Sequence, residues 1–188
     1  MWGPEGAGPL LDWLGIPTRH QVARESALDA GSQGDLTGLV LLDLPDHDST
    51  ELTHRVEVDR VVALVDLLVW VVDPQKYADE VLHAYLRRLA SHSDVMVVVL
   101  NHIDKLSRVE RERCLPHLQQ LLTDDGLAGV PVLATSAVTG AGVEELRGRL
   151  RKVVSERHAA AARTTADLVA VARRLRETVD GPGNAAIR

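Results

Sequence analysis

Short apolar segments alternate with segments of helical periodicity along most of the chain. Four runs rich in Leu and β-branched residues each end in a polar residue, and they occupy residues 39–43, 67–73, 95–101 and 130–135. The runs are continuous, which indicates strands buried on both faces, as in a parallel sheet. Between them, apolar residues recur every three or four positions, which predicts helices. The alternation therefore predicts an α/β fold with a doubly wound, mostly parallel sheet flanked by helices.

The helix predicted after the run 95–101 has the clearest start signal. Ser107 and Glu110 are three residues apart, the spacing of a capping box. Pro116 lies inside the same helical pattern. Because proline lacks a backbone N–H and its ring collides with the preceding turn, we expect it to kink or split this helix.

The two ends of the chain differ from its middle. Residues 1–37 are rich in Gly, Pro and polar residues and are predicted to be irregular, whereas the α/β domain is predicted over 38–157. Residues 158–188 form a predicted helical extension and tail, in which apolar or small residues alternate in spacings of four and three at 161, 165, 168, 172, 175 and 179. This stripe spans less than three heptads, so we expect a stem that packs on a neighbouring helix rather than a free coiled coil.

Composition narrows the class of protein. The 188 residues suit one domain, and 45% hydrophobic with 26% charged residues excludes a disordered chain. With a net charge of −6 and 3% aromatic residues, the chain offers little to bind a phosphate backbone or stack bases, so no nucleic-acid partner is predicted. The apolar runs are too short to cross a bilayer, and the single cysteine and the absence of a signal-peptide pattern predict a cytoplasmic protein.

Polar residues follow three of the predicted strands. Asp43 ends the first strand, the run 101–104 (Asn-His-Ile-Asp) ends the third, and the run 135–137 (Thr-Ser-Ala) ends the fourth. Each is weak alone, since an Asp at a strand end is most often a loop cap. The carboxyl ends of parallel strands lie at one edge of a sheet, so together the three signatures predict a ligand site there.

In this order the three signatures resemble the motifs of P-loop GTPases. The run 43–45 (Asp-Leu-Pro) resembles the Asp-x-x-Gly motif in its Asp-x-Pro form, 101–104 resembles Asn-Lys-x-Asp, and 135–137 resembles the Ser-Ala motif. The resemblance covers about residues 38–155, the second half of the GTP-binding domain, and points to translation-factor-related and bacterial dynamin-like members. It implies a domain that binds GTP or GDP with Mg²⁺.

The resemblance implies that Asn101, His102, Asp104, Ser136 and Ala137 bind the guanine base. A carboxylate at Asp104 would accept from two neighbouring N–H groups of guanine, a pair that adenine lacks. Asn101 would brace the loop through its amide, and the backbone N–H of Ala137 would donate to guanine O6. His102 stands where the family has a Lys whose stem lies along the base, and an imidazole would stack there instead, with lower affinity.

At the phosphate end, the resemblance assigns roles to Asp43 and His47. Asp43 would hold a water molecule on Mg²⁺, because this ion keeps several of its waters. His47 matches the position that orients the attacking water in many members, so hydrolysis would depend on positioning and charge neutralisation. Asp46 departs from the glycine of the family and adds negative charge beside the triphosphate.

The phosphate-binding loop of the family, Gly-x-x-x-x-Gly-Lys-Ser/Thr, does not occur in this sequence. In the family fold, the strand before that loop lies between the Asp-x-x-Gly strand and the next one. We therefore expect an N-terminally truncated domain whose true start lies upstream of Met1. The intact protein would then bind and hydrolyse GTP, whereas this chain alone would be inactive and need not bind a cofactor.

Two main classes of function are open. The first is a GTP-binding protein or GTPase, cytoplasmic or at the inner face of the membrane, whose membrane contacts come only from regions outside this chain. The alternative is a degenerate, nucleotide-independent module that binds a protein partner or forms a homodimer, and Asp46, His102 and the missing loop favour it for the chain as given. A third class, a phosphoacceptor domain using Asp43, would need an acidic pair and a Lys at other strand ends, which the sequence does not provide.

Overall fold

The computed structural model describes residues 8–21, 36–44, 61–62 and 64–180. Within them a sheet of three parallel strands has the order β1-β2-β3, with β1 at Leu68–Val72, β2 at Met96–Leu100 and β3 at Val132–Ala134. Trp70 lies opposite Val98, and Val98 lies opposite Val132. The prediction of a helix-flanked parallel sheet is confirmed.

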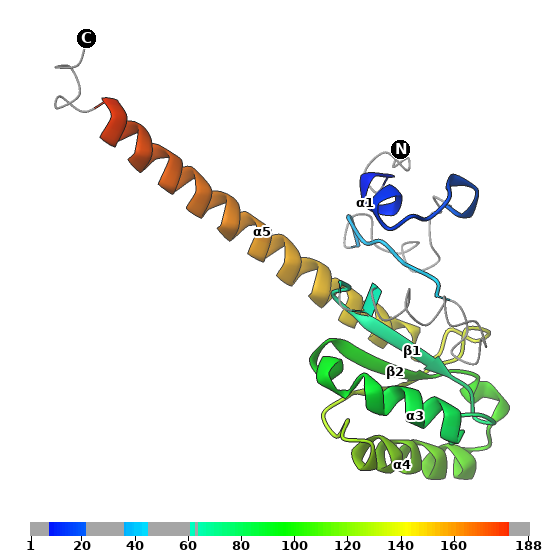
Figure 1. Ribbon diagram of the computed structural model, residues 1–188. Coiled ribbons are helices and arrows are strands. Elements are labelled where there is room, and N and C mark those ends of the chain that lie inside the picture. Colours follow the sequence, from blue (N-terminus) through cyan, green and yellow to red (C-terminus); the bar gives the residue numbers. More distant parts are fainter. Residues whose placement is uncertain (1–7, 22–35, 45–60, 63, 181–188) are drawn as a thin grey trace.

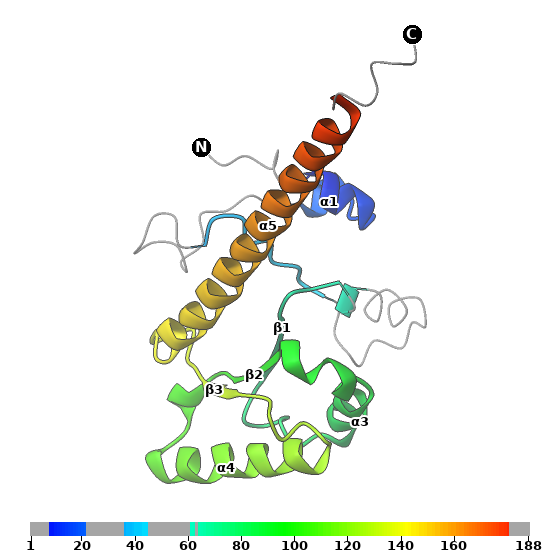
Figure 2. The same ribbon diagram turned by 90° about the vertical axis from the view of Figure 1, so that its left-hand side faces the viewer.

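Helices cover both faces of the sheet (Figures 1 and 2). On one face, α3 (Glu80–Arg88) and α4 (Arg108–Asp124) pack on β1 and β2 through a large apolar cluster that includes Leu86, Leu100 and Leu118. On the other face, Leu146 of α5 (Val143–Asp180) packs on Val97, Val99 and Leu133. All five residues of β2 are buried, which explains the continuous apolar run in the sequence.

The start of α4 follows the capping pattern in the sequence. The hydroxyl of Ser107 accepts from the backbone N–H of Glu110 at 3.3 Å, and the Glu110 carboxylate accepts from the backbone N–H of Ser107 at 2.7 Å. The prediction that Pro116 splits this helix is wrong, because α4 continues through this residue, whereas the alternative of a kink stays a prediction. Pro116 is exposed, so water can bond the carbonyl that the missing N–H leaves free.

The strand predicted over 39–43 is wrong, because residues 39–44 are extended but pair with no strand. A strand is stable only beside another, and the described residues place none between this segment and β1. Leu41 is 61% exposed, so the apolar character of the run is not matched by burial in the sheet.

Shorter elements complete the described fold. The N-terminal part contains α1 (Gly8–Trp13) and the 3₁₀ turn η1 (Thr18–His20), whereas η2 (Ala90–Val95) and η3 (Ile103–Lys105) precede and follow β2. The division into segments 1–37, 38–157 and 158–188 stays a prediction, and α5 crosses the last of these boundaries as one helix.

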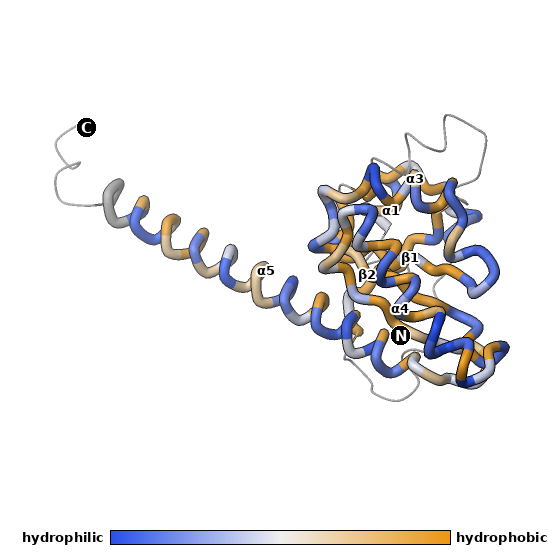
Figure 3. Tube along the Cα trace, turned by 90° about the horizontal axis from the view of Figure 1, so that it is seen from below, coloured by the Kyte–Doolittle hydropathy of each residue, from blue (hydrophilic) through white to orange (hydrophobic). Residues whose placement is uncertain are grey.

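The far half of α5 extends away from the sheet (Figures 1 and 3). Its hydropathy alternates between polar and apolar residues, in contrast to the apolar interior of the α/β body. Across the described residues, no helix has both the length and the hydropathy that a bilayer crossing requires.

Candidate functional site

Two loops that follow adjacent strands meet at the carboxyl edge of the sheet. The backbone N–H of Thr135, just after β3, donates to the carbonyl of Leu100 at 2.8 Å. The N–H of Ile103, in the loop after β2, donates to the carbonyl of Thr135 at 3.1 Å. These two bonds bring the predicted residues 101–104 and 135–137 together.

The side-chain amide of Asn101 fastens the two loops to each other. Its Oδ1 accepts from the backbone N–H of Ala137 at 3.1 Å and from the hydroxyl of Thr135 at 3.4 Å. Because this oxygen is engaged, the NH₂ group of Asn101 is the part of the amide left to donate to a ligand. The N–H of Ala137, predicted to donate to a base, has Asn101 as its partner here.

The Asp104 carboxyl has one buried oxygen and a lowered pKa. Its Oδ1 is buried and has no hydrogen-bond partner in the part of the chain that the structure describes. The hydroxyl of Ser136 is the main cause that lowers the pKa of Asp104; desolvation opposes it, and the backbone N–H of Asp104 itself and the nearby His102 and Lys105 side chains add to the lowering. Asp104 therefore offers a carboxylate acceptor with unused capacity.

Ser136 is the side chain that most strongly favours the ionised form of Asp104. It is fully buried, and its hydroxyl oxygen accepts from the backbone N–H of Thr139 at 3.1 Å, so its proton is available to Asp104. Ser136 is therefore a positioning residue: it fixes the loop and lowers the pKa of Asp104.

We expect Ser136→Ala to raise the pKa of Asp104 toward the ordinary value for a carboxyl, because the main hydrogen bond to the ionised form is lost. Any ligand that needs the carboxylate binds fully above this pKa and is released as the pH falls through it. The midpoint of release in an acid titration, followed by NMR of the Asp104 carboxyl, should thus move to higher pH in the variant. An unchanged midpoint would show that Ser136 does not act on Asp104.

His102 has an unusual backbone conformation. Its φ of 60° and ψ of 28° are left-handed, and no other non-glycine residue in the described ranges has a positive φ. His tolerates this region better than bulky or β-branched residues do, and such residues often occur at functional sites. The next residue, Ile103, is buried and anchors the loop so that His102 and Asp104 flank it.

Two glycines close the loop after β3. Gly140 and Gly142 have φ values of 78° and 70°, and the N–H of Ser136 donates to the carbonyl of Ala141 at 2.9 Å. A Cβ atom at Gly142 would lie 1.9 Å from the carbonyl oxygen of Ala134, whereas at Gly140 it would meet open space. The close backbone approach at Gly142 has no signal in the amino-acid sequence and is seen only in the structure.

The predicted phosphate-end residues are not brought into this cluster. Asp43 is exposed in the extended segment after Leu39, and in the described ranges no hydrogen bond or ion pair joins it to the base-site loops. His47 and Asp46 lie outside the described residues. No group of three or more potential metal-ligating side chains occurs among the residues that were placed.

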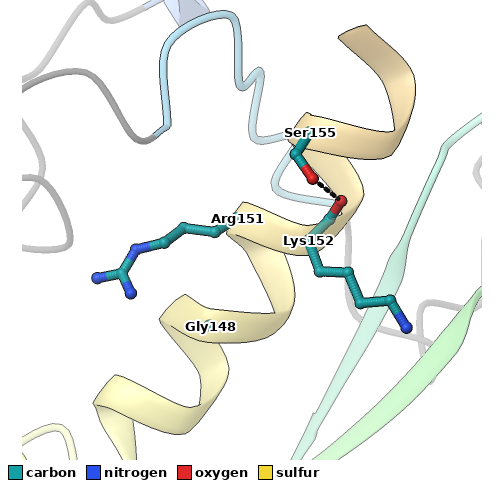
Figure 4. Close-up of a pocket in the computed structure, with 4 residues that line it drawn as sticks. All are labelled: Gly148, Arg151, Lys152 and Ser155. Atoms are coloured by element: carbon teal, nitrogen blue, oxygen red, sulfur yellow. Dashed lines mark hydrogen bonds between the residues drawn. The ribbon is translucent and has the colours of Figure 1, made fainter. Parts of the chain in front are cut away.

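A hollow of about 480 Å³ lies elsewhere, beside α5, and is lined by Gly148, Arg151, Lys152 and Ser155. Figure 4 shows Arg151 and Lys152 pointing to opposite sides of the helix, so their charges do not converge on one ligand. The hydroxyl of Ser155 donates to the carbonyl of Lys152 at 3.0 Å, and Arg151 pairs with Glu144 at 2.8 Å. These polar groups hold the helix rather than form a reactive site.

The family model of the elongation factor Tu GTP binding domain matches residues 25–156, more than half of the chain. The chain belongs to this family. No curated protein and no solved structure matches it.

Membership in the elongation factor Tu GTP binding domain family establishes a translation-factor-type GTP-binding domain with a guanine nucleotide as its ligand. The matched range contains all three strands and both loops of the site. The observed part of the parallel sheet, with helices on both faces, is consistent with an incomplete domain of this kind.

Proposed function

We propose that the two loops at the carboxyl edge bind guanine, with Asp104 as the residue that selects it. The buried Oδ1 of Asp104, which lacks a partner among the described residues, is the observation that supports this proposal most directly. A buried acceptor without a donor is costly, and a ligand N–H would satisfy it.

The chemistry of the base explains the choice of guanine over adenine. Guanine carries N–H donors on N1 and on its exocyclic N2, side by side, and a carboxylate can accept from both. Adenine has an acceptor at N1, which would face the ionised carboxylate. The lowered pKa of Asp104 keeps the ionised, selective form present to a lower pH than an ordinary carboxyl would allow.

The other residues bind the remaining edge and the face of the base. Asn101 donates from its NH₂ group, and the N–H of Ala137 is shared between Asn101 Oδ1 and the guanine O6, since this N–H already has a partner. The imidazole of His102 stacks on the base in place of the family's Lys. The hydroxyl of Ser136 lowers the pKa of Asp104.

At the phosphate end, Asp43 would hold a water of Mg²⁺ and His47 would orient the attacking water. The ion supplies charge neutralisation at the phosphates when it is bound. The donor chemistry of Asp43 suits an outer-sphere role, because a single exposed carboxylate can accept from a metal-bound water.

The dynamin-like relationship, hydrolysis by the intact protein and a phosphate-binding loop encoded upstream of Met1 stay predictions. A run of codons for Gly-x-x-x-x-Gly-Lys-Ser/Thr in the same frame is the expected upstream feature. Its absence would favour the degenerate, nucleotide-independent module.

The base site is tested by titrating the chain with GMP and with AMP to millimolar concentrations, followed by NMR. We expect GMP to bind and Asp104→Asn to weaken it by about tenfold to a hundredfold, with no gain for AMP, because one bidentate contact is lost. Asp94→Asn is the matched control, since Asp94 is an exposed Asp just before β2, at the opposite edge of the sheet. Equal binding of GMP and AMP, or no binding of either, would refute the proposal and support the alternative.

A further inference from the structure

The far half of α5 presents large apolar side chains to solvent. Every residue from Ala161 to Arg176 is exposed, and Leu168, Val169, Val171 and Leu175 are 65%, 55%, 45% and 61% exposed, respectively. The first half of the helix is different, because Leu150 is buried and Leu146 packs on the sheet. A single helix in water is marginal without tertiary packing, so this half needs a partner surface.

The exposed apolar residues occupy one side of the helix. At 100° per residue, Leu168, Val169, Val171, Ala172 and Leu175 fall within an arc of roughly 160°. Arg163, Asp167 and Arg173 fall on the opposite side of the helix. Toward the sheet, Thr165 and Ala161 lie on the same side of the helix. The residues 161, 165, 168, 172 and 175 are thus separated alternately by four and three positions, the spacing that keeps one line of residues, here called the seam, facing a second helix.

Large and small residues alternate along this seam in a way that selects a direction for the second helix. If two copies of α5 pair antiparallel about an axis near Ala170, Leu168 faces the partner's Ala172, and Leu175 faces the partner's Thr165. Every layer then combines one large and one small side chain, which fills space evenly. In a parallel pair, Leu168 meets its own copy and Ala172 meets its own copy, so crowded layers alternate with empty ones.

The borders of the seam are compatible with the antiparallel pair. Val169 and Val171 lie near the axis, where each meets its own copy, and their exposed surface becomes covered. Arg176 borders the seam at the height of the partner's Thr164, so no like charges are opposed there. The described body contacts α5 as far along as Arg157, which pairs with Asp66 at 2.7 Å about 20 Å from Ala170, so in the antiparallel pair the two bodies lie toward opposite ends.

We propose that the far half of α5 is a homodimer interface, in which a second copy of this chain pairs antiparallel along the seam of Ala161, Thr165, Leu168, Ala172 and Leu175. The paired segment is short compared with a standard interface of about 800 Å² per partner, so the dimer is weak, with a dissociation constant of about 10 μM or above.

Two matched substitutions test which side of α5 forms the dimer interface. Ala172→Glu places a charge in the seam, whereas Ala170→Glu places the same charge on the far side of the same helical turn. In sedimentation velocity over a concentration series, we expect Ala172→Glu to weaken dimerisation by about tenfold or more and Ala170→Glu to change it by less than about twofold. Far-UV circular dichroism checks that both variants keep the helix.

Cysteine cross-linking tests the direction of pairing. Cys114 is replaced by Ser, and Leu168→Cys and Ala172→Cys are then made separately in chains that differ in mass. The antiparallel pair predicts that oxidising a mixture of the two variants gives mainly the mixed disulfide, with little product from either variant alone. Efficient cross-linking of each variant with itself would indicate a parallel pair and overturn the proposal.

Two further results would also overturn it. The first is a chain that stays monomeric at several hundred micromolar, well above the expected dissociation constant. The second is a monomer that co-sediments with vesicles of phosphatidylcholine and phosphatidylserine and loses this binding in Ala172→Glu, which would identify a lipid surface as the occupant of the face. Equal effects of Ala172→Glu and Ala170→Glu on dimerisation would place the interface elsewhere.

Discussion

Gly142→Ala should lower the free energy of unfolding by about 2–5 kcal/mol, because two separate costs coincide at this position. A left-handed backbone with φ of 70° is unfavourable for alanine. The added methyl group would also lie 1.9 Å from the carbonyl oxygen of Ala134, a backbone atom of β3 that cannot move without disturbing the sheet. Since domains of this size are stable by only about 5–15 kcal/mol, we expect a clear shift of the urea midpoint.

Gly140→Ala is the matched control for this substitution. Its φ of 78° imposes the same backbone cost, but a Cβ atom there has no neighbour within 4 Å. It should cost only about 1–2 kcal/mol, so the difference between the two variants measures the clash alone. Equal losses in the two variants would show that β3 and the loop adjust freely. In that case the loop would not be held rigid at the edge of the sheet.

Asp125→Ala should destabilise the fold by about 3–5 kcal/mol, because it breaks a buried pair on the opposite side of the sheet from α5. The side chains of Asp125 and His83 are both 5% exposed and contact each other through Oδ2 and Nδ1. The other ring nitrogen of His83 bonds the carbonyl of Tyr77 at 2.8 Å. Removal of the carboxylate leaves a buried polar ring with one partner missing, and releases the loop before α3 from the end of α4.

The control for this prediction is the substitution of Glu80, the second carboxylate that pairs with Arg87. Arg87 bonds Asp125 at 2.9 Å and Glu80 at 2.6 Å, but the Glu80 side chain is 81% exposed. Glu80→Ala should therefore leave the unfolding transition almost unchanged, because exposed ion pairs contribute little. Thermal and urea denaturation of the two variants provide the comparison. A loss for Glu80→Ala as large as that for Asp125→Ala would contradict the role given to burial.

The sequence pattern identified the sheet where burial was complete. The run that became β2 is apolar at every position because both of its faces are covered. The runs that became β1 and β3 are also apolar but only partly buried, and Val71 of β1 is 62% exposed. The run 39–43 has the same composition but no strand beside it among the described residues. The composition of a segment indicates whether it can be buried. Whether it forms a strand also depends on a neighbouring strand, which the residue pattern of the segment does not reveal.

The base-site loops could be predicted because their residue types are tied to ligand chemistry at known strand ends. The mutual bond between Asn101 and Ala137, and the action of Ser136 on Asp104, needed the structure. His83 gave no usable signal, since a single His on an apolar helix face does not reveal its distant partner Asp125. The prediction that Pro116 splits α4 failed for a related reason, because the spacing of apolar residues does not show that this turn of the helix is exposed.

The long helix α5 begins immediately after the loop that carries Ser136 and Ala137 and continues without a break for 38 residues. At 1.5 Å per residue its far end lies about 57 Å from Val143. Arg157 of α5 pairs with Asp66 at 2.7 Å, and beyond this contact the helix continues for about 35 Å. If a ligand at the proposed base site tilted this part of α5 by about 5°, its far end would move by about 3 Å.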